Sequence, residues 1–379
     1  MIYLDNSATT RVFNEVADAV SRMMTSAYGN PSSLHEAGFE AEKALKDARR
    51  NVASAFPSSG SVVFTSGGTE SDNFALVSGY RLKKRESNRI ITTTIEHPAV
   101  LETVKMLESQ GAEVVYIPVD RNSRLDMDAL KEEASKGAAV ISVMAVNNET
   151  GAMMPLCLVN EVKGNALLHC DAVQALGKED IASLPGDLIS VSGHKVHGPK
   201  GIGALYINKS IKLQPFITGG GQEMGLRSGT ENTPGIVGFG MAVKKELEDF
   251  HQNRKLMEKL NTSLKEGLLS EIDDIRINSP EDGCKAILNV SFLGTRGEVI
   301  LHSLEQEGIM VSTGSACSSG KNAHKSGSHV LKAMGLSEEE IQGAIRFSFG
   351  SFNTMEEIPI VVDKVKSSVE RFRRLGSFR

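Results

Sequence analysis

The sequence has few cysteines, and none of them is in a pattern typical of a disulfide or metal site. Four cysteines occur in 379 residues, as Cys157, Cys170, Cys284 and Cys317. No two form a CxxC pair, which argues against both a disulfide framework and a structural zinc site. We therefore expect reduced thiols and no bound metal.

Long apolar runs and a strong excess of one charge are also missing. No apolar stretch reaches the roughly 20 residues of a membrane-spanning helix, and the opening MIYLDNSATT is neither a basic leader nor an apolar signal segment. The net charge of −5 gives no general attraction to nucleic acid or to an anionic membrane. The sequence predicts a cytoplasmic protein that acts on small molecules, with no direct nucleic-acid or membrane partner.

Short β-rich runs alternate with helical patterns from about residue 60 to residue 210. The runs are VVFT, RIITTTIEH, EVVYIPV, AAVISVMAV, ALLHCDAV, DLISVSGHK and GALYI. This alternation predicts an α/β fold whose mostly parallel, seven-stranded sheet has helices on both faces. AAVISVMAV is apolar without alternation, as expected for a central strand covered on both sides.

A smaller α/β unit is predicted beyond the sheet. A long helical pattern over residues 233–269 follows a Gly-rich stretch and is expected to bridge two domains, and AILNVSF and IRFSFG are predicted strands. The N-terminal strand is expected to return to this unit. We predict a large domain over residues 14–251 and a small domain made of residues 1–13 and 252–379.

Lys195 stands where open α/β sheets bind ligands. In VSGHKVHGPKGIG it follows the end of a predicted strand and precedes a Gly-rich turn. A partly desolvated lysine there can form a Schiff base, although a surface lysine beside a turn is an alternative for this segment alone. Asp171 ends the preceding strand, from which its carboxylate could reach a pyridine nitrogen in the same pocket. A helix N-cap is the alternative role for Asp171.

The segment FTSGGTESDN predicts an anion cradle. Its glycines let the backbone approach a phosphate, the helix that begins near Thr69 offers free N–H groups, and the Thr69 hydroxyl adds a donor. A plain capping box is a competing and compatible interpretation. The segment is not a GxxxxGK[ST] loop, and GPKGIG lacks GxGxxG order, so nucleotide binding is disfavoured.

Together these segments resemble the cysteine desulfurases of the NifS/IscS-like branch, within the class V aminotransferase family of fold-type I pyridoxal-phosphate (PLP) enzymes. The resemblance runs almost end to end. It includes YLDNSATT, NPSSLHEAG, TSGGTESDN, EHPAV, NNETG, HCDAVQALGK, SGHKVHGPKGIG, GGGQEMGLRSGTEN, GSACSSG and IRFSFG. It implies a fold-type I transferase fold, PLP held as a Schiff base, and a homodimer.

The resemblance also implies roles for single residues near the cofactor. Lys195 matches the Schiff-base lysine that takes the substrate's α-proton, and Asp171 matches the partner of the ring nitrogen. Gln174 matches the residue bonded to the phenolic oxygen. His97 matches the histidine stacked on the ring, although a turn residue before a proline is its alternative. Matches to the residues around the phosphate are Gly68, Thr69, Ser192, His194 and, from the neighbouring subunit, Thr230.

Asn148 of NNETG and Arg346 of IRFSFG match the substrate-carboxylate site, and Asn148 also matches a cofactor neighbour. A guanidinium fork suits a carboxylate in a way that lysine does not. An ordinary salt bridge on a strand is the alternative for Arg346.

Cys317 narrows the resemblance to desulfurases. It lies in TGSACSSGKNAHKSGSH, whose composition predicts an exposed, mobile loop at about residues 312–328, with Lys321, His324 and Lys325 nearby to favour the thiolate. The other three cysteines are interpreted as small buried hydrophobes. The resemblance implies that L-cysteine gives L-alanine and a persulfide on Cys317. That sulfur then passes to an acceptor protein for iron–sulfur cluster assembly or tRNA thiolation.

The sequence departs from the family pattern in two places, and three other functions are alternatives to a desulfurase. Gly193 replaces a more usual serine or alanine, and the stretch after Cys317 lacks an LEPS-type continuation, which leaves the acceptor undetermined. An aminotransferase of the same family would not need Cys317. A non-catalytic sulfur-relay partner would not need Lys195, Asp171 and His97 together. A selenocysteine lyase is harder to distinguish, because selenium release can proceed without the thiol.

Overall fold

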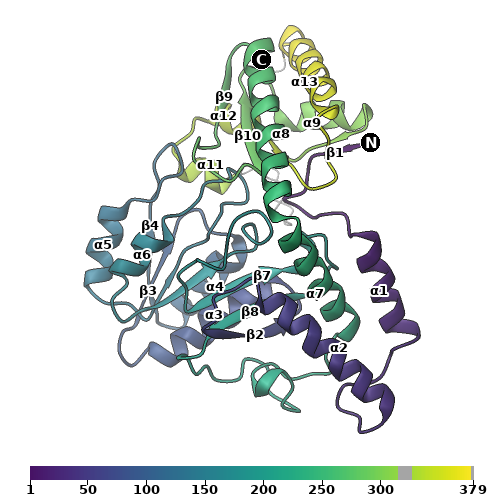
Figure 1. The fold of residues 1–379 in the computed structure, drawn as a ribbon. Helices are drawn as coiled ribbons and strands as arrows, with labels where there is room; N and C mark the ends of the chain where they lie inside the picture. Colours follow the sequence, from purple (N-terminus) through teal and green to yellow (C-terminus); the bar gives the residue numbers. More distant parts are fainter. Residues whose placement is uncertain (315–326, 377–379) are drawn as a thin grey trace.

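A seven-stranded sheet forms the larger part of the chain (Figure 1). The computed structural model describes residues 1–314 and 327–376, and residues 315–326 and 377–379 lie outside the described part. The strand order is β2-β8-β7-β6-β5-β3-β4. In this sheet β8 runs opposite to the other six strands, which confirms the predicted mostly parallel arrangement. The strands are β2 (Gly60–Thr65), β3 (Arg89–Thr93), β4 (Glu113–Ile117), β5 (Val140–Ser142), β6 (Leu167–Asp171), β7 (Leu188–Ser192) and β8 (Gly203–Asn208).

Both faces of this sheet are covered by helices. Alternate residues of a strand point to opposite sides, and in the central strands the residues on both sides are apolar. Val140 and Leu167 pack against α3 and α4, whereas Ile141 and Leu168 face the core shared with α2, α5, α6 and α7. Helices of this part are α1 (Asn14–Thr25), α2 (Glu36–Ala53), α3 (Gly68–Lys83), α4 (Pro98–Ser109), α5 (Met127–Ser135), α6 (Leu156–Val162) and α7 (Thr233–Glu248). Among the described residues, none of the helices has the length and apolar character to cross a membrane.

A second unit of strands and helices lies beside one end of this sheet (Figure 1). It contains a three-stranded antiparallel sheet of order β12-β10-β9, and the N-terminal strand returns to pair with β11 as expected. Its strands are β1 (Ile2–Tyr3), β9 (Ile275–Ile277), β10 (Ile287–Phe292), β11 (Ile309–Met310) and β12 (Ala344–Ser348). Its helices are α8 (Phe250–Glu271), α9 (Gly297–Gln306), α11 (His329–Ala333), α12 (Glu338–Gln342) and α13 (Glu357–Arg374). The domain boundaries given above remain a prediction.

The long helical pattern over residues 233–269 forms two helices instead of one. Asp249 (φ −95°, ψ 5°) leaves the helical region between α7 and α8, although its N–H still donates to the Lys245 carbonyl. The two helices pack against different partners, since α7 lies along α1 and α2 while α8 lies along α13. The bend at Asp249 allows each helix to follow its own layer.

The crossing of α2 and α7 depends on a missing side chain at Gly240. A Cβ atom there would lie 2.6 Å from the Cα of Ala48, which is backbone and cannot rotate away. We predict that Gly240→Ala lowers the free energy of unfolding by about 1–3 kcal/mol, as overpacking does. The lower midpoint would be measured by urea unfolding.

Gly79 of α3 provides the matched control for this substitution. A Cβ atom there would meet side chains of Leu167, Leu188 and Val140 at an ordinary 3.4 Å. Gly79→Ala should therefore be neutral or stabilise by up to about 1 kcal/mol through helix propensity. Equal losses in the two variants would contradict the packing argument.

Candidate active site

The carboxyl ends of the parallel strands meet at one edge of the large sheet and carry most of the predicted site residues. Strands that run in the same direction bring their ends to a common edge, where open α/β sheets bind ligands. Gly68 and Thr69 follow β2, His97 follows β3, Asn148 follows β5, Asp171 ends β6, and Ser192, His194 and Lys195 end β7 or follow it. Residues far apart in the sequence are therefore neighbours here.

Asp171 is 5% exposed at the end of β6, and it accepts a hydrogen bond from the Val173 N–H at 2.9 Å. A series of turns follows instead of a helix, so the N-cap alternative is wrong. Burial raises the pKa of Asp171 to about 6, and the carboxylate of Asp72 is the second cause of this increase. Gln174 donates through Nε2 to the Ser7 carbonyl at 2.9 Å and accepts from the Lys178 Nζ at 3.1 Å.

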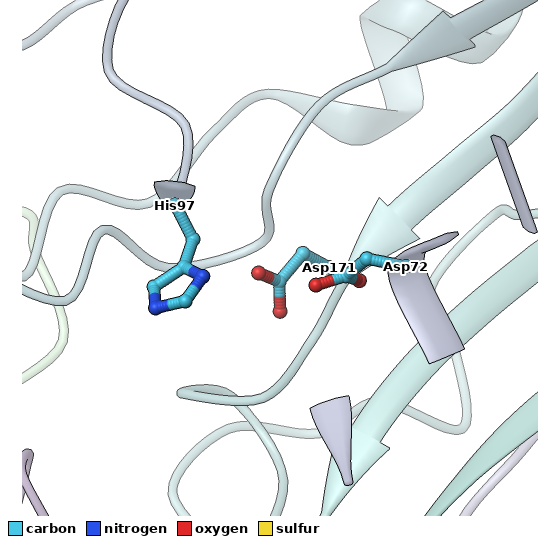
Figure 2. Close-up of side chains that lie close together, drawn as sticks. All are labelled: Asp72, His97 and Asp171. Atoms are coloured by element: carbon cyan, nitrogen blue, oxygen red, sulfur yellow. The ribbon is translucent and has the colours of Figure 1, made fainter. Parts of the chain in front are cut away.

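His97 has a structural role and also faces the site. Its Nδ1 accepts from the Ala99 N–H at 3.1 Å and caps α4, so the predicted alternative role at the turn is present. Burial lowers the pKa of His97, and the neutral ring then carries its proton on Nε2. Figure 2 shows the His97 ring on one side of the Asp171 carboxylate and Asp72 on the other.

Asp72, His97 and Asp171 are close enough to be considered as metal ligands. Each offers one ligand atom, and these atoms lie within 4.8 Å of one another. Sequence reasoning named His97 and Asp171 but passed over Asp72, although it stands in the TESDN motif. A metal would compete directly with an organic cofactor for this space.

Lys195 lies on the short 3₁₀ turn Gly193–Lys195 after β7. Its Nζ donates to the carbonyl oxygens of Ser7 and Ala8, the latter at 2.9 Å. The N-terminal segment continues along this turn, where the Thr10 N–H donates to the His194 carbonyl at 2.9 Å. Sequence reasoning used YLDNSATT only as a family motif and missed this contact. A run of small polar residues directly after a strand was the available signal.

The predicted phosphate cradle lies at the start of α3. A Cβ atom on Gly68 would lie 2.7 Å from Val173 Cγ2 and 3.7 Å from the Cβ of the buried Ser192, so this corner has room only for backbone. Thr69 is exposed in the first turn, where N–H groups lack partners within the helix. Thr230 is exposed and lies on the same loop as Arg227. Arg227 forms an ion pair of 2.9 Å with Glu70 of α3.

Arg346 and Asn148 meet in the structure as the resemblance implied. Arg346 is 1% exposed on β12, and its Nη1 donates to the Asn148 carbonyl at 3.0 Å. The Oδ1 atom of Asn148 is buried and makes no hydrogen bond with any described residue. Arg346 also pairs with Asp5 at 2.8 Å, so the salt-bridge alternative is realised as well. Sequence reasoning missed Asp5.

Cys317, with Lys321, His324 and Lys325, lies outside the described residues. Cys170 and Cys284 are buried as predicted, but the prediction for Cys157 is wrong, because it is exposed. Cys157 lies on α6, whose buried residues are Leu156 and Val159, so Cys157 is not on the buried face of this helix.

The residues at this edge fit a planar cofactor that carries a phosphate. A buried acid can face a ring nitrogen, an amine lies on the neighbouring strand end, a corner without side chains adjoins the start of a helix, and the buried Asn148 Oδ1 has no partner among the described residues. This combination suits PLP better than a nucleotide.

Comparison with known proteins identifies the family. Residues 2–361 match the class-V aminotransferase family. The chain is 42% identical over 385 residues to a cysteine desulfurase of Trichormus azollae, covering 100% of this chain and 95% of the relative. It is 42% identical over 382 residues to the cysteine desulfurase IscS of Methanosarcina thermophila, covering 99% and 93%. The chain belongs to the cysteine desulfurases of the class-V aminotransferase family.

Solved structures of similar proteins agree with this assignment. A NifS-like protein matches with a TM-score of 0.86 at 38% identity, covering 100% of both chains. SspA in complex with cysteine matches with a TM-score of 0.80 at 33% identity, covering 93% of this chain and 100% of that one. The predicted fold-type I architecture is confirmed, and enzymes of this family depend on PLP.

A buried acid beside this desulfurase site allows a test by pH. Glu96 is fully buried, its Oε1 accepts from the Thr93 hydroxyl at 2.7 Å and the Met144 N–H at 3.0 Å, and burial raises its pKa to about 8. Such an acid keeps its proton in the folded state after the unfolded chain has lost it. Its contribution to stability is full below the unfolded pKa of about 4.5 and is lost as pH rises through about 8.

We predict that Glu96→Gln becomes more stable relative to wild type as pH rises from about 5 to about 8. The slope should reach up to about 1.4 kcal/mol per pH unit, measured by urea unfolding of cofactor-free protein at several pH values. The same change at the exposed Glu266 is the control and should give a constant difference. A constant difference for Glu96→Gln would show that its proton affinity is not raised.

Proposed function

We propose that this chain removes the sulfur atom from L-cysteine, gives L-alanine and holds the sulfur as a persulfide on Cys317, with PLP bound through Lys195. The single observation that carries the proposal is the meeting of Lys195, Asp171 and His97 at one edge of the sheet, beside the Asn148–Arg346 pair. The relatives named as cysteine desulfurases and the neighbour solved with cysteine support the choice of substrate.

The cofactor would be held mainly by residues that end the parallel strands. Asp171 would face the ring nitrogen, Gln174 the phenolic oxygen and His97 the open face of the ring. The phosphate and its surroundings would be bound by Gly68, Thr69, Ser192, His194 and Asn148, with Thr230 of a second subunit. When bound, PLP withdraws electrons from the α-carbon of the substrate.

Lys195 would take the α-proton of the substrate. Its amine is held by the carbonyls of Ser7 and Ala8, which supports a fixed position for Nζ. His97 accepts at Nδ1 from the backbone, so only Nε2 is available to hold or release a proton toward the substrate.

Arg346 would bind the substrate carboxylate together with Asn148. The guanidinium has several N–H donors in one plane, so it can keep its ion pair with Asp5 and still present a fork to a second carboxylate. The Oδ1 of Asn148, which has no partner in the described part of the chain, would accept a hydrogen bond from the bound substrate.

Cys317 would attack the substrate sulfur as a thiolate. The sulfur–sulfur bond forms as the carbon–sulfur bond breaks, the carbon keeps the electron pair and is then protonated, and alanine leaves. The acceptor of the persulfide would be a scaffold protein for iron–sulfur assembly or a thiolation protein. On the C-terminal side of this segment, Ser328 donates to the buried Glu149, which lies in the NNETG loop after β5.

The other functions considered from the sequence have less support. The curated relatives named above are cysteine desulfurases, which does not favour an aminotransferase, a selenocysteine lyase or a non-catalytic relay protein. A homodimer is proposed because the resemblance gives Thr230 to the partner's site. It is supported by exposed apolar side chains around α1 and α2, of which Tyr28 is 75% and Leu34 is 91% exposed.

We predict that the wild-type protein is yellow, binds about one PLP per chain and forms alanine from L-cysteine. Cys317→Ser should keep the cofactor but lose at least about 100-fold in alanine formation, because no thiolate accepts the sulfur. Lys195→Ala should lose the cofactor's characteristic absorbance. Alanine would be measured by chromatography, and a Cys317→Ser variant as fast as wild type would contradict the mechanism.

We predict that Arg346→Lys raises KM for L-cysteine at least about tenfold, because an ammonium group cannot replace a planar fork. Asp5→Asn is the matched control. It removes the charged partner of Arg346 and should lower the melting temperature, but it should leave KM within about threefold of wild type. Steady-state kinetics of both variants provide the check, and an unchanged KM for Arg346→Lys would leave only a structural role.

A further inference from the structure

A second buried carboxylate, Asp72, stands behind Asp171. Asp72 lies on α3 and is 1% exposed. One of its carboxylate oxygens lies within 4.8 Å of a carboxylate oxygen of Asp171 and of a ring nitrogen of His97. Figure 2 shows that Asp72 faces Asp171 on the side away from His97. Asp72 is not among the residues that would bind the cofactor or the substrate.

Three polar side chains on neighbouring strands lie beneath α3, the helix that carries Asp72. Ser142 is paired in register with His169, and Ser190 with Asp171. His169 and Asp171 are two residues apart on β6, so both point to the face that α3 covers. This register brings Ser142, His169 and Ser190 together beneath α3, although they come from β5, β6 and β7.

Two hydrogen bonds join His169 to serines on the neighbouring strands. His169 Nδ1 lies 2.8 Å from Ser142 Oγ, and its Nε2 lies 3.0 Å from Ser190 Oγ. Burial lowers the pKa of His169 to about 4, so the ring is neutral and has one proton to donate. The Ser190 hydroxyl favours the charged form of Asp72, because it lowers the pKa of that carboxyl, although burial has the larger and opposite effect. In the tautomer with the proton on Nε2, Ser142 donates to His169 and His169 donates to Ser190, so the Ser190 hydroxyl proton is left for Asp72.

A neutral His169 does not cancel the charge of Asp72. Its Nε2 lies 3.4 Å from Asp72 Oδ1, and that oxygen makes no hydrogen bond with any described residue. When Asp72 is ionised, its negative charge therefore acts on Asp171 and raises the pKa of that carboxyl. A carboxylate beside another carboxylate makes both hold protons more tightly.

We propose that Asp72 is a positioning residue that acts through Asp171. Its carboxylate, which lies beside His169 of the Ser142–His169–Ser190 group, raises the proton affinity of Asp171 and of the ring nitrogen to which Asp171 would bond. The inference rests on the proposed function, because that function supplies the ring nitrogen. The consequence is that two carboxylates, and not one, keep this nitrogen protonated.

The other titratable groups around Asp72 leave this effect in place. From the segment before α4 come Glu96, which its pKa of about 8 keeps protonated at neutral pH, and His97, which burial keeps neutral. From β6 comes Cys170, whose thiol burial keeps protonated. Lys195 follows β7, and its charge lowers the pKa of His97. Burial raises the pKa of Asp72 itself to about 7, so a cation beside Asp171 would favour its ionised form.

The test is nitrogen-15 NMR of ring-labelled PLP bound to wild type, Asp72→Asn and Glu96→Gln. Asparagine has the shape of aspartate without its charge. The Asp72→Asn variant should still bind PLP, but the protonation constant of its ring nitrogen should be about tenfold or more lower than in wild type. The nitrogen signal of the variant should then change to the unprotonated form at a lower pH than that of wild type. Glu96→Gln, which removes a buried acid that is already neutral, should match wild type.

An unchanged nitrogen signal in Asp72→Asn, or an equal change in Glu96→Gln, would overturn the inference while leaving the proposed function intact. A wild-type protein that binds no PLP would instead contradict the proposed function. If Asp72→Asn does not fold, Ser190→Ala removes the last donor of the chain, and a smaller shift in the same direction is expected. A wild-type protein that carries about one zinc ion per chain, absent from Asp72→Asn, would show that the cluster is a metal site and overturn the inference.

Discussion

The carboxylate of Asp171 lies at the end of a central strand, almost completely removed from water. A buried charge is costly unless an opposite charge or hydrogen-bond donors compensate it, and the structure gives this group one backbone donor and a second carboxylate as neighbour. This arrangement is unfavourable for the protein alone. It becomes favourable when a cation lies against Asp171. The geometry around β6 therefore suits a cofactor ring whose nitrogen is protonated.

The N-terminal segment joins the parts of the site. After pairing with β11, it brings Asp5 to Arg346 and then the carbonyls of Ser7 and Ala8 to Lys195. Ser7 also accepts from Gln174, so a few residues contact groups proposed to serve the substrate, the cofactor and the proton transfer. The position of the lysine amine therefore depends on the far end of the chain.

The strands of the large sheet could be predicted because each is a short apolar run, and parallel strands must bring their ends together. Lys195, Asp171 and His97 could be predicted for the same reason, with the family resemblance supplying their roles. The partners Asp5 and Asp72 could not, because a single acidic residue has no pattern, and only folding shows what it faces. The exposure of Cys157 and the break at Asp249 likewise depend on which helix faces meet neighbours.

The most direct test of the account is a crystal structure of the protein as purified. We predict electron density that is continuous from Lys195 Nζ into a planar ring, with the ring nitrogen at hydrogen-bond distance, about 2.7–2.9 Å, from a carboxylate oxygen of Asp171. A single strong peak of metal density between Asp72, His97 and Asp171, with no density joined to Lys195, would contradict it.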